Sequence, residues 1–93
     1  MLNINIVGNS YQKCRPSKYD TDIKFIDEPD NKFDNKAIAI YSIRENKNKK
    51  LGYVLKNETG LIRKYRKKIN ILGITKKNNT KHPAYYSLLI EIK

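Results

Sequence analysis

The 93-residue chain has one cysteine, Cys14, and one histidine, His82. A single cysteine cannot form an internal disulfide, and a zinc site normally needs four nitrogen or sulfur ligands. The sequence therefore predicts no disulfide framework and no bound metal, and it indicates no other cofactor. We interpret Cys14 as an incidental loop residue and His82 as a solvated loop residue.

Long apolar runs are missing as well. No window contains the roughly 18 apolar residues that a membrane-spanning helix needs, and the segment MLNINIVGNS has no basic leader. We therefore expect a soluble intracellular protein, in the cytoplasm or in a host cytoplasm, with no membrane partner. With 39% hydrophobic residues, a chain of this length can build one core, which predicts a single domain over residues 1–93.

The motifs of common enzyme classes are also absent. The chain has neither a Gly-rich phosphate loop nor a GxSxG elbow. Four carboxylates do share one segment: Asp27, Glu28, Asp30 and Asp34. The metal site of a two-metal nuclease is hard to assemble from them. We expect no catalysis and no small-molecule substrate, and a metal-dependent nuclease stays a minor alternative.

Positive charge is abundant and unevenly distributed. Residues 1–34 carry five basic and six acidic side chains, whereas residues 35–93 carry 15 basic and three acidic ones. A region this basic attracts polyanions, among which nucleic acid is the commonest. An acidic protein surface or anionic lipid would be attracted too, so charge alone leaves the partner open.

Short segments with alternating or continuous apolar residues predict six strands: LNINIV (2–7), DIKFID (22–27), residues 36–43, LGYVL (51–55), INILGIT (69–75) and YYSLLIEIK (85–93). The segment RENKNKK (44–50) is expected to be a charged hairpin tip, and KKNNTKHP (76–83) a second, disordered tip. Several short strands joined by turns are typical of a sandwich or a small barrel. The fold class predicted is mainly β, with one or two short helices.

The periodicity changes in NETGLIRKYRKKI (57–69), which predicts a short amphipathic helix. Asn57 is the expected N-cap, and Glu58 would lie at the positive end of the helix dipole. One stripe is apolar and would face the core: Leu61, Ile62, Tyr65 and Ile69. The opposite stripe is basic and would be solvated: Arg63, Lys64, Arg66, Lys67 and Lys68.

The segment EPDNKFDNKAIAI (28–40) is a turn followed by a buried strand. Pro29 disfavours helix at Glu28, and the turn-forming side chains of Asp30, Asn31 and Asp34 follow. Together with INIVGNSY (4–11) and LGYVLKNETGLI (51–62), in this order, the segment resembles the HIRAN domain family. The resemblance covers nearly the whole chain.

The resemblance implies both a fold and a function. HIRAN domains are small β-barrels related to OB-folds, and the best understood of them, attached to a fork-remodelling DNA translocase, grips the 3′-hydroxyl end of single-stranded DNA. By this likeness we expect a six-stranded antiparallel OB-like β-barrel. The function expected is a stand-alone, non-catalytic module that binds the 3′-OH end of single-stranded DNA in a barrel pocket.

The same resemblance assigns roles to individual residues. Tyr11 and Phe33 would sandwich the last base or its sugar, and Asp34 would accept a hydrogen bond from the 3′-OH. A terminal phosphate would be repelled by that carboxylate. Asn31 would hold the terminal nucleotide or shape its loop. Tyr53 and Lys56 would each contact a phosphate.

Four positions depart from the family pattern. Ser10 stands where DNA-end-binding members can have Arg, and Phe33 where Tyr is common, which keeps the stacking face without its hydroxyl. Lys32 and Leu55 stand where Pro is frequent, so the loop is expected to be looser and more cationic. Lys32 is thus a further candidate for phosphate contact. Other cations would form an auxiliary basic patch: Lys13, Arg15, Arg63, Lys64 and Lys67.

Architectural roles remain open for several of these residues. Tyr11 and Tyr53 could cap the core, and Asp34 could be a turn residue whose side chain bonds the following backbone. A second function remains open too. It is a protein-interaction module, of viral or mobile-element origin, that docks on a DNA-processing protein and regulates it.

Overall fold

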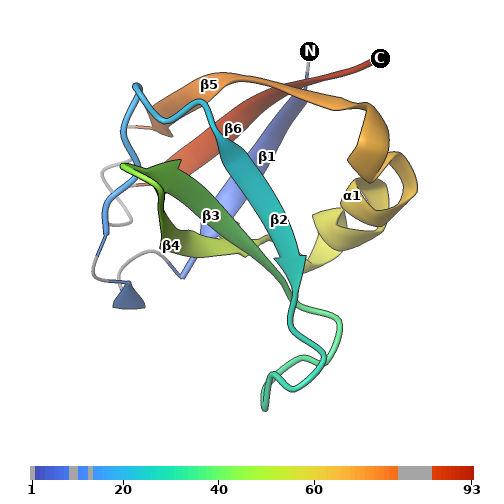
Figure 1. Ribbon diagram of the computed structural model, residues 1–93. Coiled ribbons are helices and arrows are strands. Elements are labelled where there is room, and N and C mark those ends of the chain that lie inside the picture. The colour runs from blue at the N-terminus through green and yellow to red at the C-terminus, as the bar shows by residue number, and fades with distance from the viewer. Residues whose placement is uncertain (1, 9–10, 13, 78–84) are drawn as a thin grey trace.

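The strands expected from the apolar pattern form one antiparallel sheet. The computed structural model describes residues 2–8, 11–12, 14–77 and 85–93. The strands are β1 (Leu2–Val7), β2 (Ile23–Asp27), β3 (Ile38–Arg44), β4 (Lys47–Val54), β5 (Ile69–Lys77) and β6 (Tyr85–Ile92) (Figure 1). Between β4 and β5 lie three short helical segments: η2 (Lys56–Glu58), α1 (Thr59–Tyr65) and η3 (Arg66–Lys68). The prediction of a mainly β fold is confirmed.

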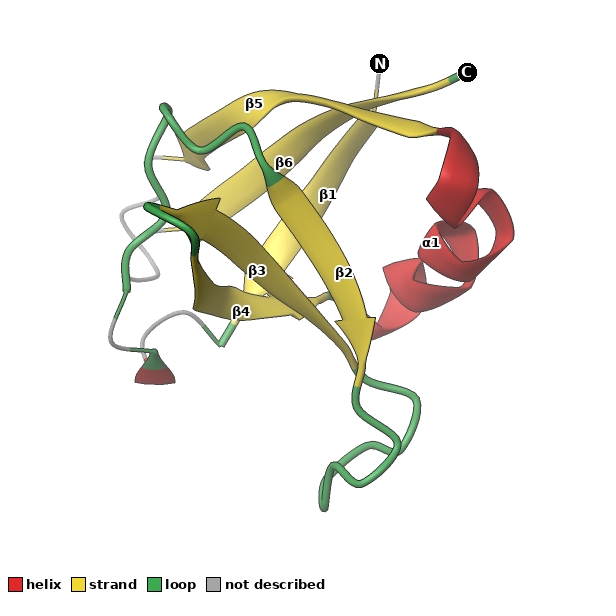
Figure 2. Ribbon diagram, viewed as in Figure 1, coloured by secondary structure: helices red, strands yellow, loops and turns green. Residues whose placement is uncertain are grey.

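The sheet order is β2-β3-β4-β1-β6-β5. The register shifts between Ile40 and Tyr41 and again between Ile71 and Gly73, and such irregularities bend strands. The sheet curls over itself, so that β2 and β3 lie in front of β1 and β6 (Figure 2). Among the described residues no ladder joins the edge strands β2 and β5, so the closed barrel expected by resemblance is not detected.

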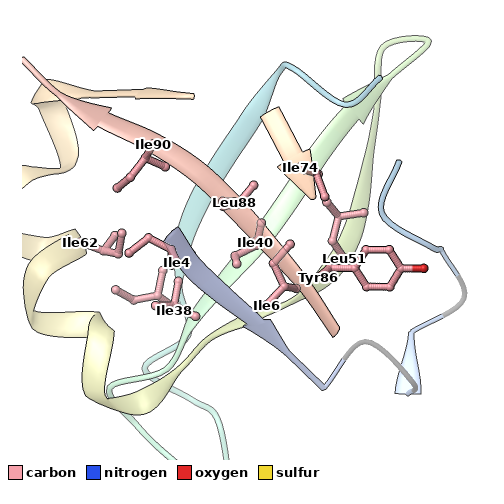
Figure 3. Close-up of a cluster of buried hydrophobic side chains, with 11 residues drawn as sticks. Ile4, Ile6, Ile38, Ile40, Leu51, Ile62, Ile74, Tyr86, Leu88 and Ile90 are labelled. Carbon is pink, nitrogen blue, oxygen red and sulfur yellow. The ribbon is translucent and has the colours of Figure 1, made fainter. Parts of the chain in front are cut away.

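The core lies between the two halves of the curled sheet (Figure 3). Neighbouring strands contribute alternate side chains, and the fully buried ones include Ile4, Ile38, Ile40, Leu51, Leu88 and Ile90. In β1 the alternation holds for Ile4 and Ile6, whereas Leu2 is 42% exposed at the strand's start. Helix α1 closes one end of this core with Ile62, which has no exposed surface.

The hairpin between β3 and β4 is tighter than the expected seven-residue tip. Only Glu45 and Asn46 form the turn, both with positive φ (51° and 66°), as in a type I′ hairpin. Arg44 pairs with Lys47, and β4 therefore begins four residues before Leu51. Of the second expected tip, Lys76 and Lys77 belong to β5, and 78–83, including His82, lie outside the described residues.

The predicted helix over 57–69 is broken into η2, α1 and η3. The prediction of Asn57 as N-cap is wrong, because Asn57 lies inside η2 and Glu58 precedes α1. The Glu58 side chain instead accepts hydrogen bonds from the Asn5 backbone N–H (2.9 Å) and Nδ2 (3.3 Å), which tie the helix to β1. None of the helices in the described part of the chain has the length and apolar character needed to span a bilayer.

Replacing Ile62 with Ala is expected to lower the free energy of unfolding by about 2–5 kcal/mol, because the cavity would open at the junction of α1 and the sheet. Urea denaturation measures this loss. Lys64→Ala, on the exposed side of the same helix, is the matched control and should change stability by about 0.5 kcal/mol or less. Similar losses in both variants would contradict the assignment of Ile62 as the helix's anchor.

Candidate nucleic-acid interface

The loop between β2 and β3 is held in shape by its own polar side chains. Asn31 Oδ1 accepts hydrogen bonds from the backbone N–H groups of Phe33 (2.9 Å) and Asp34 (3.1 Å). Asp34 Oδ1 in turn accepts the N–H of Lys36 at 2.9 Å. These are Asx-type turns, in which a side chain replaces a backbone acceptor. Asn31 and Asp34 therefore both act as turn residues, which was one of the open alternatives.

The ordered loop presents three residues that the sequence singled out. Phe33 is 98% exposed, and Lys32 beside it is exposed too. Asp34 is half-buried, and its second oxygen, Oδ2, has no hydrogen-bond partner among the described residues. The loop thus displays an aromatic face, a cation and a carboxylate oxygen that is able to accept a hydrogen bond.

Glu28 joins this loop to β4. Its Oε1 accepts hydrogen bonds from Asn31 Nδ2 (3.1 Å) and from the Tyr53 hydroxyl (2.8 Å), and its Oε2 is 2.7 Å from Lys50 Nζ. The Lys50 ammonium also donates to the Tyr53 hydroxyl at 2.6 Å and lies 4.4 Å from the centre of that ring. Burial would raise the pKa of Glu28, but these hydrogen bonds and the Lys50 charge together lower it below its ordinary value.

Tyr53 also contacts the turn that carries Tyr11. Val7 at the end of β1 pairs with Tyr53, and a Cβ on Gly8 would lie 3.6 Å from the Tyr53 ring. Gly8 has φ +71°, a conformation that favours glycine, and its carbonyl accepts the N–H of Tyr11 at 3.2 Å. Tyr11 itself is 88% exposed and does not cap the core.

The structure thus connects the two exposed rings through Tyr53 and Glu28. The loop 28–37 projects from the lower side of the molecule in Figure 1. Lys56, three residues after Tyr53, is exposed at the start of η2. Ser10 and Lys13 lie outside the described residues.

The auxiliary basic residues differ in their positions in the chain and in their contacts. Arg15 is exposed, far along the chain from the helix. Arg63 donates to the Lys36 carbonyl at 2.6 Å, so α1 borders the loop. Lys64 and Lys67 are exposed on the helical segments. Most of the basic stripe is expected to be solvated, and Arg66 departs from this because its guanidinium binds both oxygens of Asp27 at 2.9 and 3.0 Å.

Lys50 and the central role of Glu28 were missed by sequence reasoning. From the sequence, Lys50 is expected in a charged hairpin tip, and Glu28 stands out only for its turn signal and its acidic neighbours. No short-range pattern links two residues 22 positions apart. Within the described ranges no group of three or more His, Cys, Asp and Glu side chains is placed to hold a metal. Two of the four carboxylates, Asp27 and Glu28, have cationic partners.

Comparison with known proteins gives one result. A family model described as HIRAN domain matches residues 1–92. No curated protein matches the chain, and no solved structure does.

Replacing Glu28 with Gln is expected to lower the free energy of unfolding by roughly 1–2 kcal/mol at neutral pH, because it weakens charge-assisted hydrogen bonds. The pKa of Glu28 is lowered in the folded state from an ordinary value of 4.5, so its contribution is present above pH 4.5 and is lost as the pH falls through the folded pKa. The stability difference between the wild type and Glu28→Gln should therefore shrink below pH 4.5.

Urea titrations over this pH range measure the difference. Asp30→Asn, at an exposed position in the same loop, is the control and should cost little at any pH. A Glu28→Gln deficit that stays constant down to acidic pH would contradict the assigned role of the carboxylate.

Proposed function

Because the chain belongs to the HIRAN domain family, a family generally associated with DNA binding, we propose that it is a non-catalytic module that binds single-stranded DNA and recognises its 3′-OH end. In this proposal the curled sheet serves as an OB-like barrel, and the terminal nucleotide binds beside the loop 28–37. Single-stranded DNA offers bases for stacking, phosphates for cations, and one terminal hydroxyl.

The exposure of Phe33 and Tyr11 is the observation that carries the proposal. Rings that are 98% and 88% exposed leave a large apolar surface in water, yet each sits on a turn that hydrogen bonds hold in shape. A base stacked on an aromatic ring contributes about 1–3 kcal/mol. Because the hydrogen bonds of the loop that carries Phe33 are already formed, little of the gain at that ring is lost to ordering the loop.

The terminal hydroxyl would be read by Asp34. Its Oδ1 is occupied by the Lys36 N–H, which orients the carboxylate, and Oδ2 is left to accept a hydrogen bond from the 3′-OH. A 3′-phosphate in the same position would place two negative charges next to each other, which is unfavourable. Two exposed cations, Lys32 next to Phe33 in the chain and Lys56 at the start of η2, would hold the phosphates further along the strand.

The first test compares oligonucleotides that end in 3′-OH with the same strands ending in 3′-phosphate. We expect the hydroxyl form to bind about 10- to 100-fold more tightly, since a hydrogen bond to a charged group is worth about 1.5–3 kcal/mol. Asp34→Asn should remove most of this preference, because the amide oxygen can still accept the Lys36 N–H while the negative charge is lost.

Fluorescence anisotropy with labelled strands measures both affinities. A circular single strand, which has no end, is the control, and its weaker binding should not respond to Asp34→Asn. Equal affinity of the wild-type protein for the two linear strands would sink the proposal of end recognition.

The second test removes each exposed ring. Phe33→Ala and Tyr11→Ala should each weaken binding of a 3′-OH strand by about five- to 100-fold, the equivalent of one lost base stack. Phe33→Tyr should retain affinity because it keeps the face. Neither alanine variant should change thermal stability, since both rings are exposed.

Leu72→Ala, which removes an apolar side chain 40% exposed on β5, is the matched control and should leave DNA affinity unchanged. The dependence of log affinity on log salt should keep its slope in all three alanine variants, because no charge is removed. An alanine variant at Phe33 or Tyr11 with wild-type affinity would show that the ring does not stack on DNA.

A further inference from the structure

A third exposed aromatic ring lies outside the interface described so far. Tyr19 is 79% exposed, and Lys18 Nζ lies 5.1 Å from the centre of its ring. The turn beneath it is closed by three hydrogen bonds: Asp20 N–H to the Ser17 carbonyl (3.0 Å), Ser17 N–H to Asp20 Oδ2 (2.8 Å) and Tyr19 N–H to Ser17 Oγ (3.2 Å). The ring is therefore displayed on a fixed support, as Phe33 is.

This turn is anchored to β3 through Asp20, which is only 5% exposed. Its carboxylate accepts hydrogen bonds from Ser42 Oγ (2.7 Å), from Arg44 Nε (2.6 Å) and from Arg44 Nη2. Arg44 also donates to Cys14 Sγ (2.8 Å) and to the Arg15 carbonyl (2.7 Å). The interpretation of Cys14 as an incidental loop residue is therefore wrong, because its sulfur helps hold the segment that connects Tyr11 to Tyr19.

Two exposed lysines lie directly opposite the anchor residues. In the ladder of β3 and β4, Ser42 pairs with Lys49 and Arg44 pairs with Lys47. Residues 14–22 and 44–49 together hold five basic and three acidic side chains, and one acid, Asp20, is neutralised by Arg44. The surroundings of Tyr19 are thus cationic, which suits a polyanion better than an apolar partner.

The chain itself connects this turn to the interface already described. Residues 14–22 continue from the segment that carries Tyr11 and run along one side of the molecule to β2 (Figure 1). A strand held at its end by Phe33 and Tyr11 would meet Arg15, Lys18 and Tyr19 if it continued along this segment. The single strand would then contact two sites of the same kind, each made of an exposed aromatic ring with cations nearby.

We propose that Tyr19, with Lys18 and Arg15, forms a second stacking subsite, which holds an internal nucleotide of the single strand on the 5′ side of the terminal nucleotide. This inference rests on the proposed function. The proposed subsite extends the interface beyond the terminal nucleotide. It also makes affinity increase with strand length, and this increase depends on the Tyr19 ring.

The test measures the affinity of 3′-OH oligothymidylates of increasing length, from a trinucleotide upward, for the wild type, Tyr19→Ala and Tyr19→Phe. The wild type should gain affinity with length. Tyr19→Ala should bind the shortest strand normally and bind long strands about five- to 100-fold more weakly than the wild type, the equivalent of one lost stack. Tyr19→Phe should match the wild type at all lengths, because it keeps the ring.

The Tyr19 variants are expected to fold like the wild type, since Tyr19 is exposed and its side chain takes no part in the contacts of Asp20 with Ser42 and Arg44. If Tyr19→Ala binds every length like the wild type, or loses affinity equally for all lengths, the subsite is overturned and the proposed function stands. If the wild-type protein binds no single strand at any length, the proposed function fails and the subsite fails with it.

Discussion

The Glu28 carboxylate is the interaction on which the candidate interface depends. This carboxylate binds Asn31 in the loop 28–37 and also binds Tyr53 and Lys50 in β4, and so it joins the loop to the strand. Tyr53 in turn lies against Gly8, where the turn that carries Tyr11 begins. Without this carboxylate, the loop 28–37 would lose its side-chain hydrogen bonds to β4, and among the described residues only the backbone of the sheet would connect the two. A partly buried carboxylate is stable here because each of its oxygens has a donor.

The uneven charge of the sequence has a structural explanation as well as a functional one. Three acids from the first part of the chain, Asp20, Asp27 and Glu28, each pair with a cation from the second part. In each case a loop or strand end is fastened to a more distant element, and the pKa of the carboxyl is lowered by hydrogen bonds that outweigh its burial where it is buried. Folding therefore pairs three of the six acidic side chains in residues 1–34 with cations. The exposed lysines that remain give the surface its positive character, and these are the groups available to a polyanion.

The sequence predicts what depends on local patterns and misses what depends on distant partners. Alternating apolar residues place the strands, and the helical stripe correctly includes Ile62 in the core. The start of β4 was missed because Lys47 and Lys49 give no apolar alternation, although Asn46 tolerates the positive φ of the turn. Glu28 was recognisable as a residue before proline, but its partner Lys50 is fixed only when β3 and β4 pair. The turn formed by the Asp34 side chain was one of the alternatives that the sequence offered, whereas the exposure of Phe33 and the oxygen of Asp34 that the turn uses required the structure.

The neutralised acids also determine how selective the loop 28–37 can be. Phosphates would be repelled by every unpaired carboxylate near the rings, so a nucleic-acid interface in an acidic segment requires that most of those charges be cancelled. Asp27 is cancelled by Arg66 and Glu28 by Lys50, while Asp34 keeps an oxygen without a partner among the described residues. In the proposed function, this oxygen separates a hydroxyl from a phosphate, because only the hydroxyl can donate a hydrogen bond to it. Within the described part of the chain, two acidic side chains of the loop, Asp30 and Asp34, are left without an ion pair, and Asp34 directly follows the exposed Phe33 in the chain. In the proposed function, Asp34 is therefore the group that discriminates between strand ends.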